Sequence, residues 1–118
     1  GVIVCDMNDS RLDMATGMGA DLTASPAAVE DAVSAATGAM GVDMAVECTG
    51  MPEVWERAPA YVRRGGTVIL FGGCRAGTSA TFDTHRLHYN EISMHGSFHF
   101  TPRDVHRAYN MLKSKEID

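Results

Sequence analysis

The sequence predicts an α/β fold in which parallel strands form a doubly wound sheet with helices on both faces. Strand-like and helix-like segments alternate along the whole 118-residue chain, and this alternation is typical of parallel sheets covered by helices. The strongest strand signals are continuous apolar runs, as expected for strands that are buried on both faces. Small or polar residues follow each run, at the sheet edge where ligands bind in folds of this class.

Strand signals occur where short runs of β-branched and apolar residues end in glycine or a polar residue. The predicted strands are 2–5, 21–24, 42–48, 67–71 and 91–95. The run 67–71 is the clearest, because four consecutive apolar residues are followed by Gly72 and Gly73. A loop rich in glycine, serine and threonine is expected over 75–84.

Helix signals fill the intervals between the strands, with apolar residues at helical spacing. The predicted helices are 10–18, 27–37, 52–64 and 101–112. Asn8 or Asp9 can cap the first helix, and Thr101 can cap the last. Gly38 and Gly65 are expected stops for the second and third. One continuous domain without repeats or linkers is therefore predicted.

Composition excludes several classes of function. The chain has 10 basic and 15 acidic residues, a net charge of −5, so a nucleic-acid partner is not expected. Hydrophobic residues make up 45% of the chain, which argues against disorder. No apolar run approaches the length that spans a bilayer, so no membrane partner is expected. Three widely spaced cysteines indicate no disulfide framework and fit a reducing, cytoplasmic location.

Asp6 is the most informative single residue. It follows the first strand segment, where an acidic side chain can accept hydrogen bonds from the ribose hydroxyls of a dinucleotide. Such a carboxylate would repel a 2′-phosphate and so favours NAD over NADP. Arg11 could reach the same ribose, although an arginine there could also accommodate a 2′-phosphate. A turn or helix-capping Asp6 and an exposed Arg11 are equally compatible with these positions.

Other motifs give weaker signals. The phosphate-binding pattern G-x-G-x-x-G, expected about 20 residues before such an aspartate, does not occur in the chain. Histidine pairs at 85/88 and 95/99 have metal-like spacing, but surface histidines explain them more simply. Glu47 suits either a structural role at a strand end or general acid–base chemistry, and Cys48 suits either a reactive thiol or a small buried residue. No catalytic or metal-binding residue is assigned.

Taken together, these segments resemble the coenzyme-binding, Rossmann-type domain of the medium-chain dehydrogenases. The similar segments are 2–6, 11–12, 18–21, 41–50 and 64–72. Residues 90–98, followed by 101–104 and 113–118, are similar to the zinc-containing alcohol, sorbitol and threonine dehydrogenase branch. The resemblance covers nearly the whole chain in order, and identifies residues 1–118 as a partial NAD-binding domain without the catalytic zinc domain.

The resemblance implies which residues contact the cofactor. Asp6 and Arg11 would lie at the adenosine ribose, and the segment Cys48, Thr49 and Gly50 would border the adenosine side. The nicotinamide ribose and carboxamide would be reached by Leu70, Phe71, Gly72, Ser97 and His99. Zinc would belong to the full-length enzyme, with its ligands outside this chain.

The family sheet has the strand order 3-2-1-4-5-6, and this chain matches it from the second strand onward. The first strand and the Gly-rich loop are therefore expected to be absent, which leaves a gap between two strand edges. Unpaired edges invite pairing with another chain, so we expect self-association of residues 1–118 and weak NAD binding by this segment alone. Family members are commonly homo-oligomers.

The predicted function is coenzyme binding within a zinc-dependent, NAD-linked alcohol or polyol dehydrogenase, which takes a small alcohol through the missing domain. A zinc-free, NADPH-using quinone-reductase-type relative is one alternative, which Asp6 disfavours. A non-catalytic nucleotide-binding or interaction module is another. A methyltransferase, whose second strand also ends in an acid, fits the later strands less well.

Overall fold

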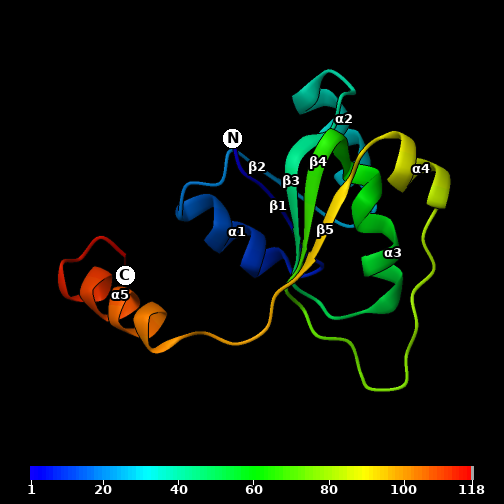
Figure 1. Ribbon diagram of the computed structural model, residues 1–118. Helices are drawn as coiled ribbons and strands as arrows, with labels where there is room; N and C mark the ends of the chain where they lie inside the picture. Colours follow the sequence, from blue (N-terminus) through cyan, green and yellow to red (C-terminus); the bar gives the residue numbers. More distant parts are fainter. Residues whose placement is uncertain (118) are drawn as a thin grey trace.

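Parallel strands alternate with helices throughout the computed structural model, which describes residues 1–117 (Figure 1). The strands are β1 (Ile3–Cys5), β2 (Leu22–Ala24), β3 (Val42–Glu47), β4 (Val62–Leu70) and β5 (Ser93–Gly96). The helices are α1 (Asp9–Gly17), α2 (Val29–Thr37), α3 (Pro52–Tyr61), α4 (Thr84–Tyr89) and α5 (Pro102–Lys113). Every strand pair in the described part is parallel. The predicted α/β class is confirmed.

The strands form two separate sheets. β1 pairs with β2, with Val4 opposite Thr23. The second sheet has the order β3-β4-β5, and Val68 in its central strand lies opposite Ala45 and Met94. Within residues 1–117 no strand pairing joins β1 to β3. These neighbours are those that the order 3-2-1-4-5-6 gives to its second through sixth strands.

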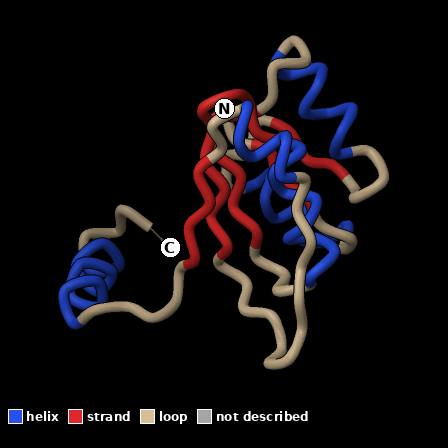
Figure 2. Tube along the Cα trace, turned by 45° about the vertical axis from the view of Figure 1, so that its right-hand side comes forward, coloured by secondary structure: helices blue, strands red, loops and turns tan. Residues whose placement is uncertain are grey.

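Two small hydrophobic clusters hold the body together. Ala24, Val29 and Val33 form the first, between β2 and α2. Ala58, Val62 and Val68 form the second, between α3 and β4, and Val68 is completely buried. The partly buried side chain of Val42 packs against both clusters. Figure 2 shows the helices of this body lying against the strands.

Three predicted helix caps are present in the structure, whereas Gly65, the predicted stop of the third helix, lies within β4. Asn8 caps α1 by accepting a hydrogen bond from the Ser10 backbone N–H. Gly38 ends α2 in the left-handed conformation, at φ 59°. At α5, Thr101 and Asp104 form a reciprocal capping box, in which each side chain bonds the other residue's backbone N–H. These contacts satisfy backbone donors that the first turn leaves without partners.

The region after α3 differs from the prediction. The helix ends at Tyr61, and β4 begins at once at Val62 instead of Thr67. Val62 pairs with Val42, and the register then shifts, so that Met44 lies opposite Thr67. The extra residues of β4 are accommodated in an irregular stretch of this pair, which apolar periodicity alone does not reveal.

A short helix over Thr84–Tyr89 is missing from the prediction. Asp83 caps it by accepting from the Arg86 backbone N–H. The Arg86 guanidinium then donates to the carbonyl oxygens of Pro59 at 3.0 Å and Ala60 at 2.8 Å. This helix is therefore held by a contact with the end of α3, which a local pattern cannot predict. β5 accordingly begins at Ser93, two residues later than expected.

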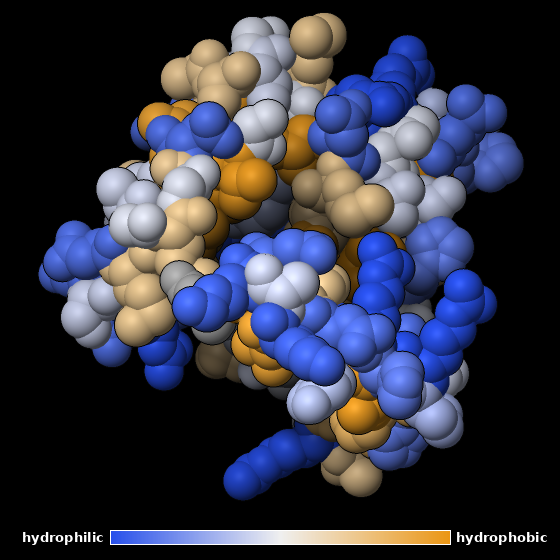
Figure 3. All heavy atoms as spheres, turned by 90° about the vertical axis from the view of Figure 1, so that its left-hand side faces the viewer, coloured by the Kyte–Doolittle hydropathy of each residue, from blue (hydrophilic) through white to orange (hydrophobic). Residues whose placement is uncertain are grey.

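Helix α5 stands apart from the rest of the body, at the end of an extended segment (Figures 1 and 2). Its apolar residues Val105, Tyr109 and Leu112 are 52%, 61% and 52% exposed. Figure 3 views the molecule from the side on which α5 lies in Figure 1, and shows apolar side chains among hydrophilic ones on that face. None of the helices in the described part is both long and apolar enough to cross a membrane.

Candidate functional site

The predicted site residues follow the carboxyl ends of four strands. Asp6 comes after β1, Cys48 after β3, Phe71 after β4 and Ser97 after β5. Because the strands of each sheet are parallel, these ends lie at one edge of their sheet (Figure 1). This is the edge at which doubly wound folds bind ligands.

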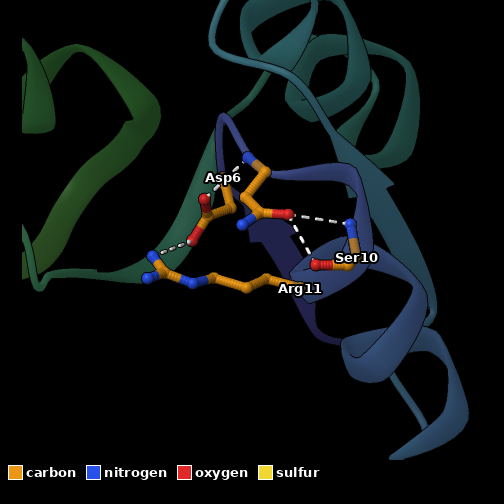
Figure 4. A network of polar contacts seen from close by, with 4 residues as sticks. Asp6, Ser10 and Arg11 are labelled. Carbon is orange, nitrogen blue, oxygen red and sulfur yellow. Dashed lines mark hydrogen bonds and ion pairs between the residues drawn. The ribbon is translucent and has the colours of Figure 1, made fainter.

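Asp6 forms a small polar network at the end of β1 (Figure 4). One of its carboxylate oxygens accepts the Asn8 backbone N–H at 2.9 Å, and the other pairs with the Arg11 guanidinium at 3.3 Å. The hydrogen bond from Asn8, followed by the contact with Arg11, holds the pKa of Asp6 below its usual range. Asp6 therefore carries a negative charge at neutral pH.

This network reconciles the two interpretations of Asp6. One carboxylate oxygen stabilises the turn into α1, as a capping residue would. The other pairs with Arg11, whose side chain is 69% exposed. The Asp6 side chain is 28% exposed. A partly exposed carboxylate oxygen beside an exposed guanidinium can accept a hydrogen bond from a sugar hydroxyl.

The ends of β3 and β4 are bound tightly to each other. The Glu47 carbonyl oxygen accepts the backbone N–H groups of Phe71 at 2.9 Å and Gly72 at 2.8 Å. Gly50, at φ +69°, and Gly72 meet backbone to backbone, and a Cβ on Gly72 would lie 2.7 Å from the carbonyl carbon of Cys48. Only glycine fits at this contact.

The carboxyl end of β5 lies beside the ends of β3 and β4. The Ser97 backbone N–H donates to the Leu70 carbonyl oxygen at 3.0 Å, so Leu70, Phe71, Gly72 and Ser97 form one continuous edge with Cys48–Gly50. His99 follows with φ +66°, an uncommon backbone conformation for a residue other than glycine. Asp6 and Arg11 belong to the other sheet, and the described contacts do not join them to this edge directly.

Cys48 is exposed. Partial burial of the thiol, together with the nearby Glu47 carboxylate, raises the pKa of Cys48 above its usual value. The thiolate is therefore disfavoured, and the arrangement gives no support to a nucleophilic cysteine. Glu47 binds the loop that follows β3, which supports the structural interpretation of this residue.

Trp55 is a site residue that the sequence did not single out. Its indole N–H donates to the Gly72 carbonyl oxygen at 2.9 Å, from the face of α3 that covers the sheet. Its apolar spacing within the helix predicted only a core position. The signal that could have found it is the polar group of tryptophan, which needs a partner when it is partly buried.

A metal site needs several ligand side chains close together. In residues 1–117, no three histidine, cysteine, aspartate or glutamate side chains come together as a metal site would require. His85 and His88 instead lie against the ring of Tyr89. No zinc ligand is assigned to this part of the chain.

Comparison with known proteins identifies this arrangement. A family model described as "Zinc-binding dehydrogenase" matches residues 1–114. The chain belongs to the zinc-binding dehydrogenase family. D-arabinitol dehydrogenase 1 of Uromyces fabae is 35% identical over 68 residues, which are 55% of this chain and 20% of that protein. An alcohol dehydrogenase of Cupriavidus necator is 36% identical over 73 residues, which are 60% of this chain and 20% of that protein.

The solved structures of zinc-binding dehydrogenases confirm the fold. A Sinorhizobium meliloti 1021 protein bound to NADP, assigned provisionally to this family, superposes with a TM-score of 0.87 at 26% identity. That superposition covers 99% of this chain and 35% of the other. The matched segments span about a fifth of the length of the curated relatives named above.

Proposed function

We propose that this chain provides the coenzyme-binding surface of an NAD-linked alcohol or polyol dehydrogenase. The family membership and the alcohol and arabinitol dehydrogenases among its relatives support the reaction class. The observation that carries the coenzyme assignment is the ionised, accessible Asp6 at the end of β1. When bound, NAD accepts a hydride from the carbon that bears the alcohol hydroxyl.

The residues after β1, and those after β3, β4 and β5, would contact different parts of a dinucleotide. Asp6 would accept hydrogen bonds from the adenosine ribose, with Arg11 beside it. The backbone of Cys48–Gly50 and Leu70–Gly72, together with Ser97 and His99, would border the rest of the molecule. Because glycines leave the main chain uncovered, a flat nucleotide can approach it closely.

NADP is the competing coenzyme, because the Sinorhizobium meliloti relative is bound to it. A 2′-phosphate beside Asp6 would place two negative groups together, which costs free energy. Arg11 could offset part of this cost only by leaving Asp6, since the two side chains are paired here. The existing ion pair therefore supports NAD.

The decisive test compares Asp6→Gly with Arg11→Ala in the protein's full natural reading frame. We expect wild type to bind NAD more tightly than NADP in calorimetry, and Asp6→Gly to reverse or abolish that preference. Arg11→Ala should keep the preference for NAD, because the carboxylate that repels the phosphate remains. An unchanged ratio of the two dissociation constants in Asp6→Gly would contradict the ribose role of Asp6.

Zinc would be held elsewhere in such an enzyme, since residues 1–117 bring no ligand set together. We place the protein in the cytoplasm, with a small alcohol as substrate.

We also propose that it self-associates. The unpaired edges of β1 and β3 and exposed apolar residues such as Val46, 55% exposed, support association. Sedimentation that shows a monomer at all concentrations would contradict it.

A further inference from the structure

Glu47 stands out as a charged residue in the interior. It is the last residue of β3, and only 4% of it is exposed. Burial of a carboxylate costs free energy unless hydrogen bonds compensate for the lost water. The partners of Glu47 therefore indicate why a charged side chain occupies this position.

The Glu47 carboxylate binds the loop that follows β3. It accepts the Thr49 backbone N–H at 2.6 Å, the Thr49 hydroxyl, and the Gly50 backbone N–H at 3.2 Å. All three groups donate to the same oxygen, Oε1, while Oε2 lies 3.4 Å from the Gly50 nitrogen. A carboxylate is a pure acceptor and suits these donors. Hydrogen bonds to a charged acceptor are stronger than those between neutral groups.

The backbone of the same residue binds the loop that follows β4. Its carbonyl oxygen accepts from Phe71 and Gly72, as described above. Glu47 thus holds both loops at once, one through its side chain and the other through its main chain. Between them lies the glycine contact, in which the backbone of Gly50 meets that of Gly72 and Gly73.

We propose that Glu47 is a positioning residue for the dinucleotide, which fixes the spacing of the two loops before the coenzyme binds. This inference rests on the proposed function, because those loops are the ones expected to border the coenzyme. Glu47 would touch neither coenzyme nor substrate, and its effect would pass through Thr49 and Gly50. Ordering the loops in advance saves the binding reaction the cost of ordering them later.

The test uses Glu47→Gln in the protein's full natural reading frame. Glutamine has nearly the same shape and can keep its oxygen at the Thr49 donors, but it loses the charge that strengthens those bonds, and its NH₂ group would face the Gly50 N–H that lies 3.4 Å from Oε2. Glu53→Gln, an exposed change in the first turn of α3, is the matched control for loss of one carboxylate. Calorimetry with NAD, at a temperature where every variant is folded, gives the dissociation constants.

We expect Glu47→Gln to raise the dissociation constant for NAD about tenfold, and Glu53→Gln to leave it unchanged. Hydrogen exchange of the backbone amides of residues 48–51 should become faster in Glu47→Gln, while exchange of residues 66–70 in β4 stays the same. Glu47→Asp, which restores an acceptor-only group, should recover part of the affinity. This rescue separates positioning from a general loss of stability.

The outcomes distinguish this inference from the proposed function. If wild type binds no nicotinamide dinucleotide, the proposed function fails and the positioning role fails with it. If wild type binds NAD and Glu47→Gln binds it equally well, only the positioning role is overturned. Should Glu47→Gln not fold, the deciding variant is Thr49→Val, which removes the hydroxyl that donates to Glu47 and accepts the Met51 backbone N–H. A weaker affinity for NAD supports the role, and an unchanged affinity contradicts it.

Discussion

The indole N–H of Trp55 donates to the carbonyl oxygen of Gly72, seventeen residues further along the chain. This bond fixes helix α3 to the loop that follows β4, and the backbone of Gly72 also meets that of Gly50. Gly72 is consequently held from α3 and from the β3 loop at the same time. Small changes at this residue should therefore have large effects.

Gly72→Ala should destabilise the chain, because the added Cβ would lie 2.7 Å from the Cys48 carbonyl carbon and 2.8 Å from the Thr49 nitrogen. Backbone cannot move aside as a flexible side chain can, so we expect a loss of about 1–3 kcal/mol in the free energy of unfolding. Gly73→Ala is the control, since a Cβ there meets nothing within 4 Å. Urea denaturation measures both; equal losses in the two variants would contradict the close contact.

Asp6 should make a pH-dependent contribution to stability. Its pKa is lowered in the folded chain, so its contribution is complete above the ordinary aspartate pKa of about 3.9. The contribution is lost as the pH falls through the lower, folded value. We expect Asp6→Asn to melt below wild type at pH 7, and the difference in melting temperature to shrink below about pH 4.

Asp13→Asn, on helix α1, controls for the loss of one carboxylate charge. A difference between wild type and Asp6→Asn that stays constant from pH 7 to pH 2 would show that the carboxylate of Asp6 is not the source of the effect. Added salt should reduce the difference at pH 7, because the pair with Arg11 is largely exposed.

Arg86→Ala should release helix α4 from the end of α3. The guanidinium donates to two carbonyl oxygens, of Pro59 and Ala60, which that helix end leaves without intrahelical partners. We expect a loss of about 1–3 kcal/mol in the free energy of unfolding. Arg86→Lys should recover only part of it, since one ammonium cannot reproduce the forked geometry. Arg75→Ala, in the exposed loop, should be neutral, and a loss as large as that of Arg86→Ala would refute this assignment.

Thr101→Ala should loosen the start of α5 by removing one half of its capping box. The expected cost to this helix is about 1 kcal/mol. Because α5 stands apart from the body, the cost should appear as faster hydrogen exchange of the Asp104 and Val105 amides, with little change in the melting of the sheets. Thr101→Ser keeps the hydroxyl and should exchange as wild type does.

Local patterns predicted most of the elements because their signals lie within the elements themselves. Asn8, Gly38, Pro52 and Thr101 mark helix ends through their own backbone or side-chain chemistry, and the structure places each where expected. The parallel sheets followed from the alternation of elements. The pairings of β1 with β2 and of β4 with β3 and β5 followed from the family's strand order.

Features that depend on distant partners were not predictable in this way. Helix α4 depends on Arg86 and the carbonyl oxygens of α3, and the early start of β4 depends on pairing between Val62 and Val42. The segments after β3, β4 and β5 lie at one edge of the sheet, as the alternation of elements predicted, and their contact with a coenzyme stays a prediction. The sequence could not indicate that Trp55 binds the loop after β4, because its partner Gly72 lies seventeen residues away. Glu47 binds the adjacent loop, and a structural role at the strand end was one of its two interpretations.

The position of Val42 between the two hydrophobic clusters has a consequence for folding. With no strand pairing between the sheets in residues 1–117, this side chain is a principal apolar link from the β1–β2 unit to the β3–β4–β5 unit. Each unit can therefore open while the other stays closed, and the chain should not unfold in a single cooperative step. A ligand that contacts both Asp6 and the β3–β4 edge would bridge the units, and would couple two local equilibria into one.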